Sequence, residues 1–443
     1  MTKPARLVIR DARVLTMGRH DGPRRGPAAM NDLGVLDRAD VVIENGVISQ
    51  VRTAGSSAPT RDPGPATVIE ARGRVLMPGF VDAHTHALWA GDRLDEWDMK
   101  RRGAAYLDIL KAGGGIMSTV RAVRQSSEAE LAAALRDRLG RMLREGTTTI
   151  EIKSGYGLTT ADELKMLRAI NTAASSWPGT VVMTALIGHA IDPQQSEFVR
   201  RTITETLPAV HAEFPGIAID AYCESGAWSL DDCTELFEKA MSLGHPVRVH
   251  ADQFNALGMT EWAAGHGALS VDHLEATTPA ALASLAASDT FGVMLPCAGF
   301  HTDGRYANGR AFVDGGGALV LATNLNPGSA PCGNIPMAVA LGVRMLGLTP
   351  AEAITAVTAN PAALLERQSA GTLPRRGIIA PGARADLVLL AHTDERMLAY
   401  EFGGNPVDVV ICSGAIAWTA GSTRHAAPHS GQTVQPSASR GRP

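Results

Sequence analysis

The sequence predicts an α/β protein: a (β/α)8 TIM barrel with a small β-sandwich domain formed from both chain ends. Short apolar segments alternate with helical patterns through the middle of the chain, which is the order of a parallel sheet with crossover helices. Both ends show strand patterns instead, and 443 residues are too many for one ordinary core. An open doubly wound sheet is the rival fold, but no GxGxxG motif follows the first central strand.

The two chain ends carry the alternation and turn residues of β structure. Leu7–Thr16 and Val41–Val51 are expected strands, and Asn45-Gly46 is a hairpin-turn signal. Met17–Asp37 is rich in Gly, Pro and Arg, so we expect an exposed loop there. The C-terminal strands are expected at Ala385–Leu390 and Val407–Trp418, with a turn at Ser413-Gly414.

Eight short apolar segments supply the strands of the predicted barrel. Each is short and bounded by helical or turn-forming sequence, as buried parallel strands are. They are Gly79–Thr85, Thr147–Lys153, Val181–Gly188, Ala218–Glu224, Pro246–Ala251, Leu269–Leu274, Gly292–Leu295 and Ala318–Thr323.

Helix starts are marked by polar residue pairs at the spacing of a capping box. Such a box joins a Ser or Thr at the N-cap to a Glu three residues later. Leu residues at i,i+4 spacing further predict a helix that packs on the sheet. The expected boxes are Ser127 with Glu130, Thr160 with Glu163 and Thr349 with Glu352, and the Leu stripe is Leu131, Leu135, Leu139 and Leu143.

These patterns divide the chain into two predicted domains and a tail. The tail is polar, has almost nothing to bury, and is expected to be disordered. The small β domain takes residues 1–77 and 376–421, the barrel takes 78–375, and the tail is 422–443.

Composition excludes several classes of protein. A net charge of -4 gives no electrostatic case for binding nucleic acid or an anionic membrane. No apolar run approaches the roughly 20 residues of a membrane helix. The first residues lack the apolar core of a signal peptide, and five scattered Cys form no CxxC pair. Reduced thiols and a cytoplasmic location are therefore expected.

The chemistry of the predicted barrel lies at the carboxyl ends of its strands. The first strand ends with His84 and His86, which share a face because strand side chains alternate. Two imidazoles converging on one point suit Zn or Fe, although an isolated HxH is equally compatible with two surface histidines.

Three other strands end in histidine as well. His189 follows the third strand, His250 ends the fifth and His273 ends the sixth. One histidine at a strand end is more often structural than a ligand, but five at one rim indicate a metal centre.

Specific motifs then identify a resemblance. The segments VDAHTHALWAGDR, YLDILKAGGGIMSTV, TTTIEIKSGYGL, VHADQFNALG, SVDHLE and NLNPGSAP resemble, in order, the imidazolonepropionase family of the amidohydrolase superfamily. The match runs from about Val41 to Ile411. The resemblance implies histidine degradation, in which water opens the cyclic amide of 4-imidazolone-5-propanoate to give N-formimidoyl-L-glutamate. It also suggests a homodimer.

The resemblance implies a role for each strand-end residue. His84, His86 and His250, together with position 324, match metal ligands for one Zn or Fe ion per chain. His273 matches a position near the reacting carbonyl, where it polarises or protonates; the alternative is an orienting histidine behind the ligands. The fourth strand ends without Lys, which disfavours a two-metal site bridged by a carbamylated lysine.

Substrate contacts are also carried over from the resemblance. A propanoate group calls for a cation and hydroxyl groups, and Gln253 can both donate to and accept from a cyclic amide. Glu224 is a weaker candidate, with helix capping as its alternative role. The expected contacts are Arg93, Tyr156, His189, Gln253, Asn326, Gly328 and Ser329, and the expected catalytic residues are His273, Gln253 and Asn324.

Asn324 departs from the family pattern, which has Asp there as a ligand and as the base for the attacking water. The Asn oxygen can still bind a metal as a neutral donor, but it cannot accept a proton at neutral pH. Loss of a general base costs about 10²–10⁴ in rate. Three interpretations stay open: a slow enzyme, an enzyme in which His273 has become the base, and a ligand-binding chain without turnover. A different cyclic amidohydrolase or aminohydrolase on the same barrel is the remaining alternative.

Overall fold

The computed structural model describes residues 6–18, 22–53, 66–103 and 114–421. Its central sheet has eight strands in the order β13-β12-β11-β10-β9-β8-β7-β6, with every neighbouring pair parallel. These strands are β6 (Phe80–Asp82), β7 (Thr147–Lys153), β8 (Thr180–Gly188), β9 (Ala218–Cys223), β10 (Val247–Ala251), β11 (Ser270–His273), β12 (Phe291–Met294) and β13 (Leu319–Leu321).

The first and last strands of this sheet are joined just beyond their carboxyl ends. Asn324 N–H donates to His84 O at 3.1 Å, and His86 N–H donates to Leu325 O at 2.9 Å. These bonds close the barrel where its site is expected. The predicted TIM barrel is confirmed, since each of the eight expected segments contains or overlaps a strand.

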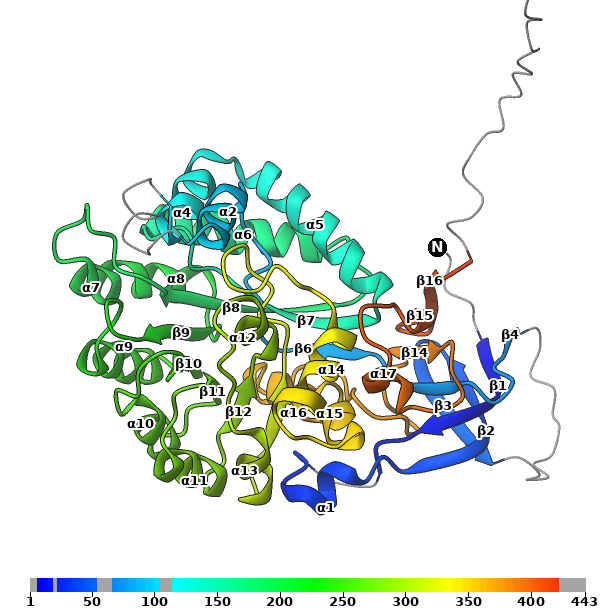
Figure 1. Cartoon of the computed structure of the whole chain (residues 1–443). Coiled ribbons are helices and arrows are strands. Elements are labelled where there is room, and N and C mark those ends of the chain that lie inside the picture. The colour runs from blue at the N-terminus through cyan, green and yellow to red at the C-terminus, as the bar shows by residue number, and fades with distance from the viewer. Residues whose placement is uncertain (1–5, 19–21, 54–65, 104–113, 422–443) are drawn as a thin grey trace, which may run out of the picture.

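Helices surround the barrel and cover the outer faces of its strands (Figure 1). The predicted Leu stripe of α5 (Glu128–Arg144) is buried, with Leu135 and Leu139 fully enclosed. The other helices are α1 (Gly26–Asn31), α2 (Leu94–Arg101), α4 (Ile116–Gln125), α6 (Thr160–Ala174), α7 (Phe198–Arg201), the π-helix η1 (Thr202–Thr206), α8 (Leu207–Glu213), α9 (Leu230–Ser242), α10 (Met259–Gly265), α11 (Pro279–Ala287), α12 (Pro296–His301), α13 (Gly309–Asp314), α14 (Ile335–Met345), α15 (Pro350–Ala356), α16 (Ala359–Gln368) and α17 (Met397–Tyr400).

A second, mixed sheet combines the two chain ends, whose blue and orange-red strands lie side by side in Figure 1. Strand β5 pairs with β14 antiparallel and with β1 parallel, so it joins the two halves. Asn45 and Gly46 have the positive φ values of a tight turn, 52° and 86°, and connect β2 to β3 as expected. The strands are β1 (Arg6–Leu15), β2 (Val35–Glu44), β3 (Val47–Thr53), β4 (Thr67–Glu70), β5 (Val75–Pro78), β14 (Leu387–Leu390), β15 (Val407–Cys412) and β16 (Ala415–Thr419).

The predicted exposed loop over Met17–Asp37 is wrong for much of its described length. The segment contains helix α1, and Met17, Arg24 and Met30 are buried. Arg24 N–H donates to Asn360 Oδ1 at 2.7 Å, far along the chain. Gly and Pro report only local geometry, so they carried no signal of this long-range docking. The predicted disordered tail, 422–443, lies outside the described residues.

Two of the three expected capping boxes are confirmed, at Ser127 and Thr349. The third is wrong by one residue: Thr159 is the N-cap of α6 and accepts from the N–H of Asp162. Glu163 therefore does not cap the helix, and its carboxylate has other partners, described below. A further box at Ser229, with Asp232 in place of Glu, was not expected.

The five cysteines form no disulfide, as expected for reduced thiols. No helix among the described residues has the length and apolar character needed to cross a bilayer.

Candidate metal centre and active site

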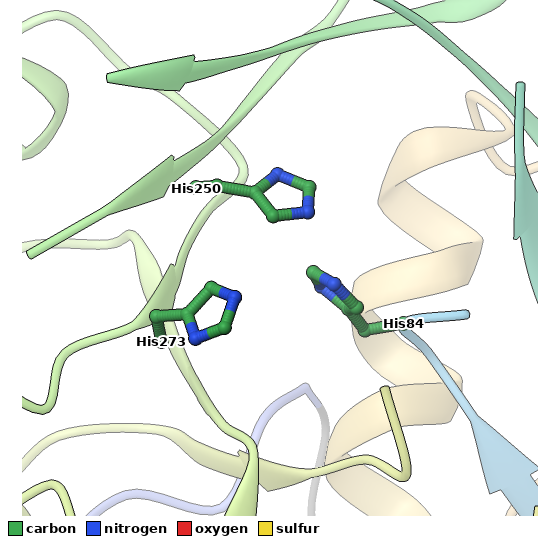
Figure 2. Close-up of side chains that lie close together, drawn as sticks. All are labelled: His84, His250 and His273. Atoms are coloured by element: carbon green, nitrogen blue, oxygen red, sulfur yellow. The ribbon is translucent and has the colours of Figure 1, made fainter. Parts of the chain in front are cut away.

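Four buried histidines gather at the carboxyl ends of β6, β10 and β11. His84, His250 and His273 each offer a ring nitrogen that lies within 4.8 Å of the others (Figure 2). His86 lies beside them, with its Nε2 3.3 Å from Nε2 of His250. The rim that the sequence predicts thus forms one compact cluster.

Three of these rings are oriented by a carboxylate on Nδ1. Asp272 lies 2.6 Å from Nδ1 of His84 and Asp220 lies 3.1 Å from Nδ1 of His250. Glu275 lies 3.1 Å from Nδ1 of His273. A carboxylate on one ring nitrogen fixes the tautomer and leaves the other nitrogen as a lone-pair donor, which is the arrangement behind metal-binding histidines.

The donor atoms fit a transition-metal ion. His84 Nε2 and Asn324 Oδ1 are buried without a hydrogen-bond partner among the described residues, which is costly unless another group satisfies them. Two imidazole nitrogens on one tetrahedral zinc, each at 2.0–2.1 Å, are about 3.3 Å apart. The separation of 3.3 Å between His86 and His250 matches that value.

The group of His84, His250 and His273 and the ligand set carried over from the family share two histidines and differ in the third. The resemblance implies His84, His86, His250 and Asn324, whereas the three histidines whose ring nitrogens all lie within 4.8 Å of one another are His84, His250 and His273. His86 Nδ1 is buried and has no partner in the part of the chain that the structure describes, so this ring lacks the orienting carboxylate of the others.

Burial keeps these imidazoles neutral. It is the largest cause lowering the pKa of His84, His86 and His250. The charge of Lys153 acts in the same direction on all three. Neutral imidazole is the form that binds metal, so the cluster is ready to bind an ion without first losing protons.

A buried ionic network lies behind the histidines. Lys153 Nζ lies 2.8 Å from Glu151 and 2.9 Å from Asp220, while Arg248 lies 2.8 Å from Asp272. Asp220 and Asp272 thus each join a cation to a histidine. Lys153 is committed to these carboxylates, so it is not available as a metal-bridging residue.

The backbone is strained at two site residues. His273 has φ +93° and Asn324 has φ +57°. Asn and Asp tolerate this left-handed region better than other residues with a Cβ. Such outliers concentrate at functional sites, where the surrounding structure holds them in place.

A cavity of about 460 Å³ opens above the cluster. All seven expected substrate contacts line it, and so do His86, His250, His273 and Asn324. The sequence did not single out the other lining residues, since an isolated charged or aromatic residue in a loop carries no signal. They are Glu96, Lys100, Ile116, Tyr222, Phe254, Thr302 and Asp303.

Arg93 is held by Glu96. Its Nε and Nη2 donate to the two carboxylate oxygens at 2.6 Å each, and Nη1 donates to Thr119 Oγ1 at 3.4 Å. The remaining N–H of Nη1 is the part of the guanidinium that lies near Gly328. Lys100 lies with Glu96 on helix α2 and has no ion-pair partner among the residues the structure describes. Arg93, Glu96 and Lys100 together carry one positive charge.

Asn326 is fully engaged within its own turn. Its Nδ2 donates to Asn324 O at 2.7 Å and to Ser329 Oγ at 2.9 Å. Its Oδ1 accepts from the N–H groups of Gly328 and Ser329 at 2.8 and 2.7 Å. The side chain thus shapes the wall that presents Gly328 and Ser329 to the cavity.

Gln253 and Glu224 belong to one loop system. The Tyr222 hydroxyl donates to Gln253 Oε1 at 2.8 Å. The amide nitrogen of Gln253 is therefore the group that remains to donate a hydrogen bond. Glu224 accepts from the N–H groups of Phe254 and Asn255 at 2.8 and 3.2 Å. Glu224 does not line the cavity, and its hydrogen bonds fix the loop that carries Gln253.

Similarity to known proteins shows the family of this chain. The model of the amidohydrolase family matches residues 75–417. An imidazolonepropionase of Herpetosiphon aurantiacus is 43% identical over 407 residues, covering 89% of this chain and 93% of the relative. One of Deinococcus radiodurans is 43% identical over 396 residues, covering 89% and 95%. A 5-methylcytosine deaminase structure from Klebsiella pneumoniae shares the fold at TM-score 0.68 and 18% identity, covering 93% of this chain and 98% of that one. The chain therefore belongs to the amidohydrolase family and, within it, to the imidazolonepropionases.

Proposed function

We propose that this protein hydrolyses the cyclic amide of 4-imidazolone-5-propanoate to N-formimidoyl-L-glutamate in histidine degradation. The observation that carries the proposal is the carboxylate-oriented group of His84, His250 and His273 beside a cavity lined by all seven expected substrate contacts. The choice of substrate is supported by the imidazolonepropionase relatives, which match about nine-tenths of the chain.

One Zn or Fe ion per chain is held, in this proposal, by His84, His86, His250 and Asn324. When bound, such an ion polarises a carbonyl and lowers the pKa of water. Three imidazoles and one amide oxygen are all neutral donors. Asp220 and Asp272 place negative charge behind this set, through their contacts with His250 and His84.

In this proposal, His273 transfers the proton. Its Nδ1 faces Glu275, so its Nε2 is the nitrogen directed to the cluster. Opening a cyclic amide needs a donor for the leaving nitrogen and an acceptor for the proton of water. Asn324 cannot accept that proton, and Gln253 acts as a hydrogen-bond donor to the substrate ring. His273 is then the residue placed to carry the proton between them.

Metal analysis combined with an absorbance assay of imidazolonepropanoate consumption tests the proposal. We expect up to one transition-metal ion per chain and measurable turnover that a chelator abolishes. Metal-loaded protein that binds imidazolonepropanoate without consuming it would favour the ligand-binding homologue that Asn324 suggests. If the protein hydrolyses other cyclic amides but not imidazolonepropanoate, the proposed substrate is wrong. A homodimer remains our prediction for the assembly, to be checked by sedimentation.

Arg93 gives a prediction on substrate grip. Arg93→Ala removes a charge-assisted donor worth roughly 1–3 kcal/mol, so KM should rise at least several-fold. The effect should be smaller on an analogue without the carboxylate. Arg102→Ala, which removes the exposed ion pair with Asp98 on the same helix, is the matched control. Equal effects on both ligands would mean that Arg93 serves the loop and not the substrate.

A further inference from the structure

We propose that Glu163 is a positioning residue: its buried carboxylate holds the loop of residues 154–158 so that Tyr156 and His189 face the substrate. The inference rests on the proposed function for its substrate, but its geometry does not depend on that substrate. Glu163 does not line the main cavity and carries no role through the family resemblance.

One carboxylate satisfies three backbone donors of this loop. Glu163 Oε2 accepts from Gly155 N–H at 2.9 Å. Its Oε1 accepts from the N–H groups of Gly157 and Leu158, both at 2.8 Å. Glu163 is buried, with 1% of its surface exposed. Each donor left unpaired in such surroundings carries a full desolvation penalty.

The loop carbonyls are anchored by side chains from three other segments. Gly155 O faces His189 Nδ1 at 2.9 Å. Arg124 Nε donates to Gly157 O at 2.8 Å, and Gln195 Nε2 donates to Leu158 O at 2.7 Å. Side chains therefore hold the loop through both kinds of backbone group. Its N–H groups donate to Glu163 of α6, and its carbonyls contact His189, Arg124 and Gln195.

Two glycines allow this close approach. Gly155 has φ +110°, and a Cβ there would lie 2.9 Å from His189 Nδ1. A Cβ on Gly157 would lie 2.5 Å from Glu163 N. The loop thus lies directly against the first turn of α6, at a distance that only glycine allows.

The loop carries one wall of the cavity. Tyr156 and His189 have ring centroids 5.1 Å apart, and His189 stacks on His86 at 5.0 Å. Tyr156 is itself 4% exposed. Release of Gly155 would shift Tyr156 directly and His189 through its hydrogen bond, while leaving His84, His250 and His273 on their own strands.

Glu163→Gln tests the inference, since it keeps the shape but replaces one of the two acceptor oxygens by an NH2 group, which can only donate. We expect KM to rise about tenfold, with a smaller change in kcat and unchanged metal content. Glu130→Gln is the matched control: it makes the same chemical change in the first turn of another helix, α5, where the exposed carboxylate accepts from the N-cap residue Ser127. Its KM should stay within about twofold of the parent value.

Hydrogen exchange of the amides at Gly155, Gly157 and Leu158 provides the substrate-independent readout. Exchange should accelerate in Glu163→Gln and stay slow in Glu130→Gln. If Glu163→Gln does not fold, Glu163→Asp keeps the charge but retreats by one methylene, and the same two changes are expected.

A double-mutant cycle separates positioning from general stability. In a Tyr156→Phe background, the KM effect of Glu163→Gln should shrink, because the hydroxyl that it positions is gone. Normal exchange and normal KM in the Glu163 variants would overturn the inference. Accelerated exchange in a parent protein that does not process imidazolonepropanoate would instead retain the positioning role and reject the proposed substrate.

Discussion

Replacing Asn324 by Asp is expected to raise kcat for imidazolonepropanoate by about 10²-fold or more, if proton abstraction limits the rate. The substitution changes side-chain volume little and adds a carboxylate where a buried amide oxygen has no partner among the described residues. The left-handed backbone at this position, with φ +57°, is compatible with Asp as well as Asn. Metal retention should also improve, since the cluster gains an anionic donor.

Steady-state kinetics of the parent and the Asn324→Asp variant, each saturated with the same metal, checks this expectation. The variant should gain an acidic limb in its pH profile, because the new carboxylate acts as a base only when ionised, and activity falls as pH drops through its pKa. Asn308→Asp makes the same chemical change at an exposed helix N-cap. This control should leave both kcat and the pH profile unchanged. An Asn324→Asp variant no faster than a normally active parent would place the base elsewhere, with His273 the next residue to replace.

His86→Ala is expected to abolish both bound metal and activity, whereas His273→Ala should keep the metal and lose about 10²–10⁴ in kcat. The first expectation follows from the 3.3 Å separation of the His86 and His250 nitrogens. The second follows from the proton-carrying role proposed for His273. His266→Ala, at the exposed end of α10, is the control for loss of a histidine as such.

Elemental analysis of the three variants decides between two ligand sets. Metal retained in His86→Ala but lost in His273→Ala would make the compact group of His84, His250 and His273 the binding site. Two tightly bound ions per chain would contradict a mononuclear centre altogether.

Local pattern was enough to predict the barrel and the histidines on its rim. Buried parallel strands are short, apolar and separated by helices, so their order is visible in the sequence. Alternation along a strand put His84 and His86 on one face, and the parallel arrangement put His250 and His273 at the same rim. The capping boxes at Ser127 and Thr349 were predictable because both partners lie within one helical turn.

Only the tertiary structure decided how these residues are supported. The carboxylate behind His84 is Asp272, 188 residues away, and the partner of Arg24 is 336 residues away. The misplaced box at Thr160 concealed the use of Glu163, because Glu at that spacing is equally suited to a helix cap or to the loop in front of it. Local propensity acts over a few residues, whereas these pairings exist only after the barrel closes and burial leaves each polar group dependent on protein partners in place of water.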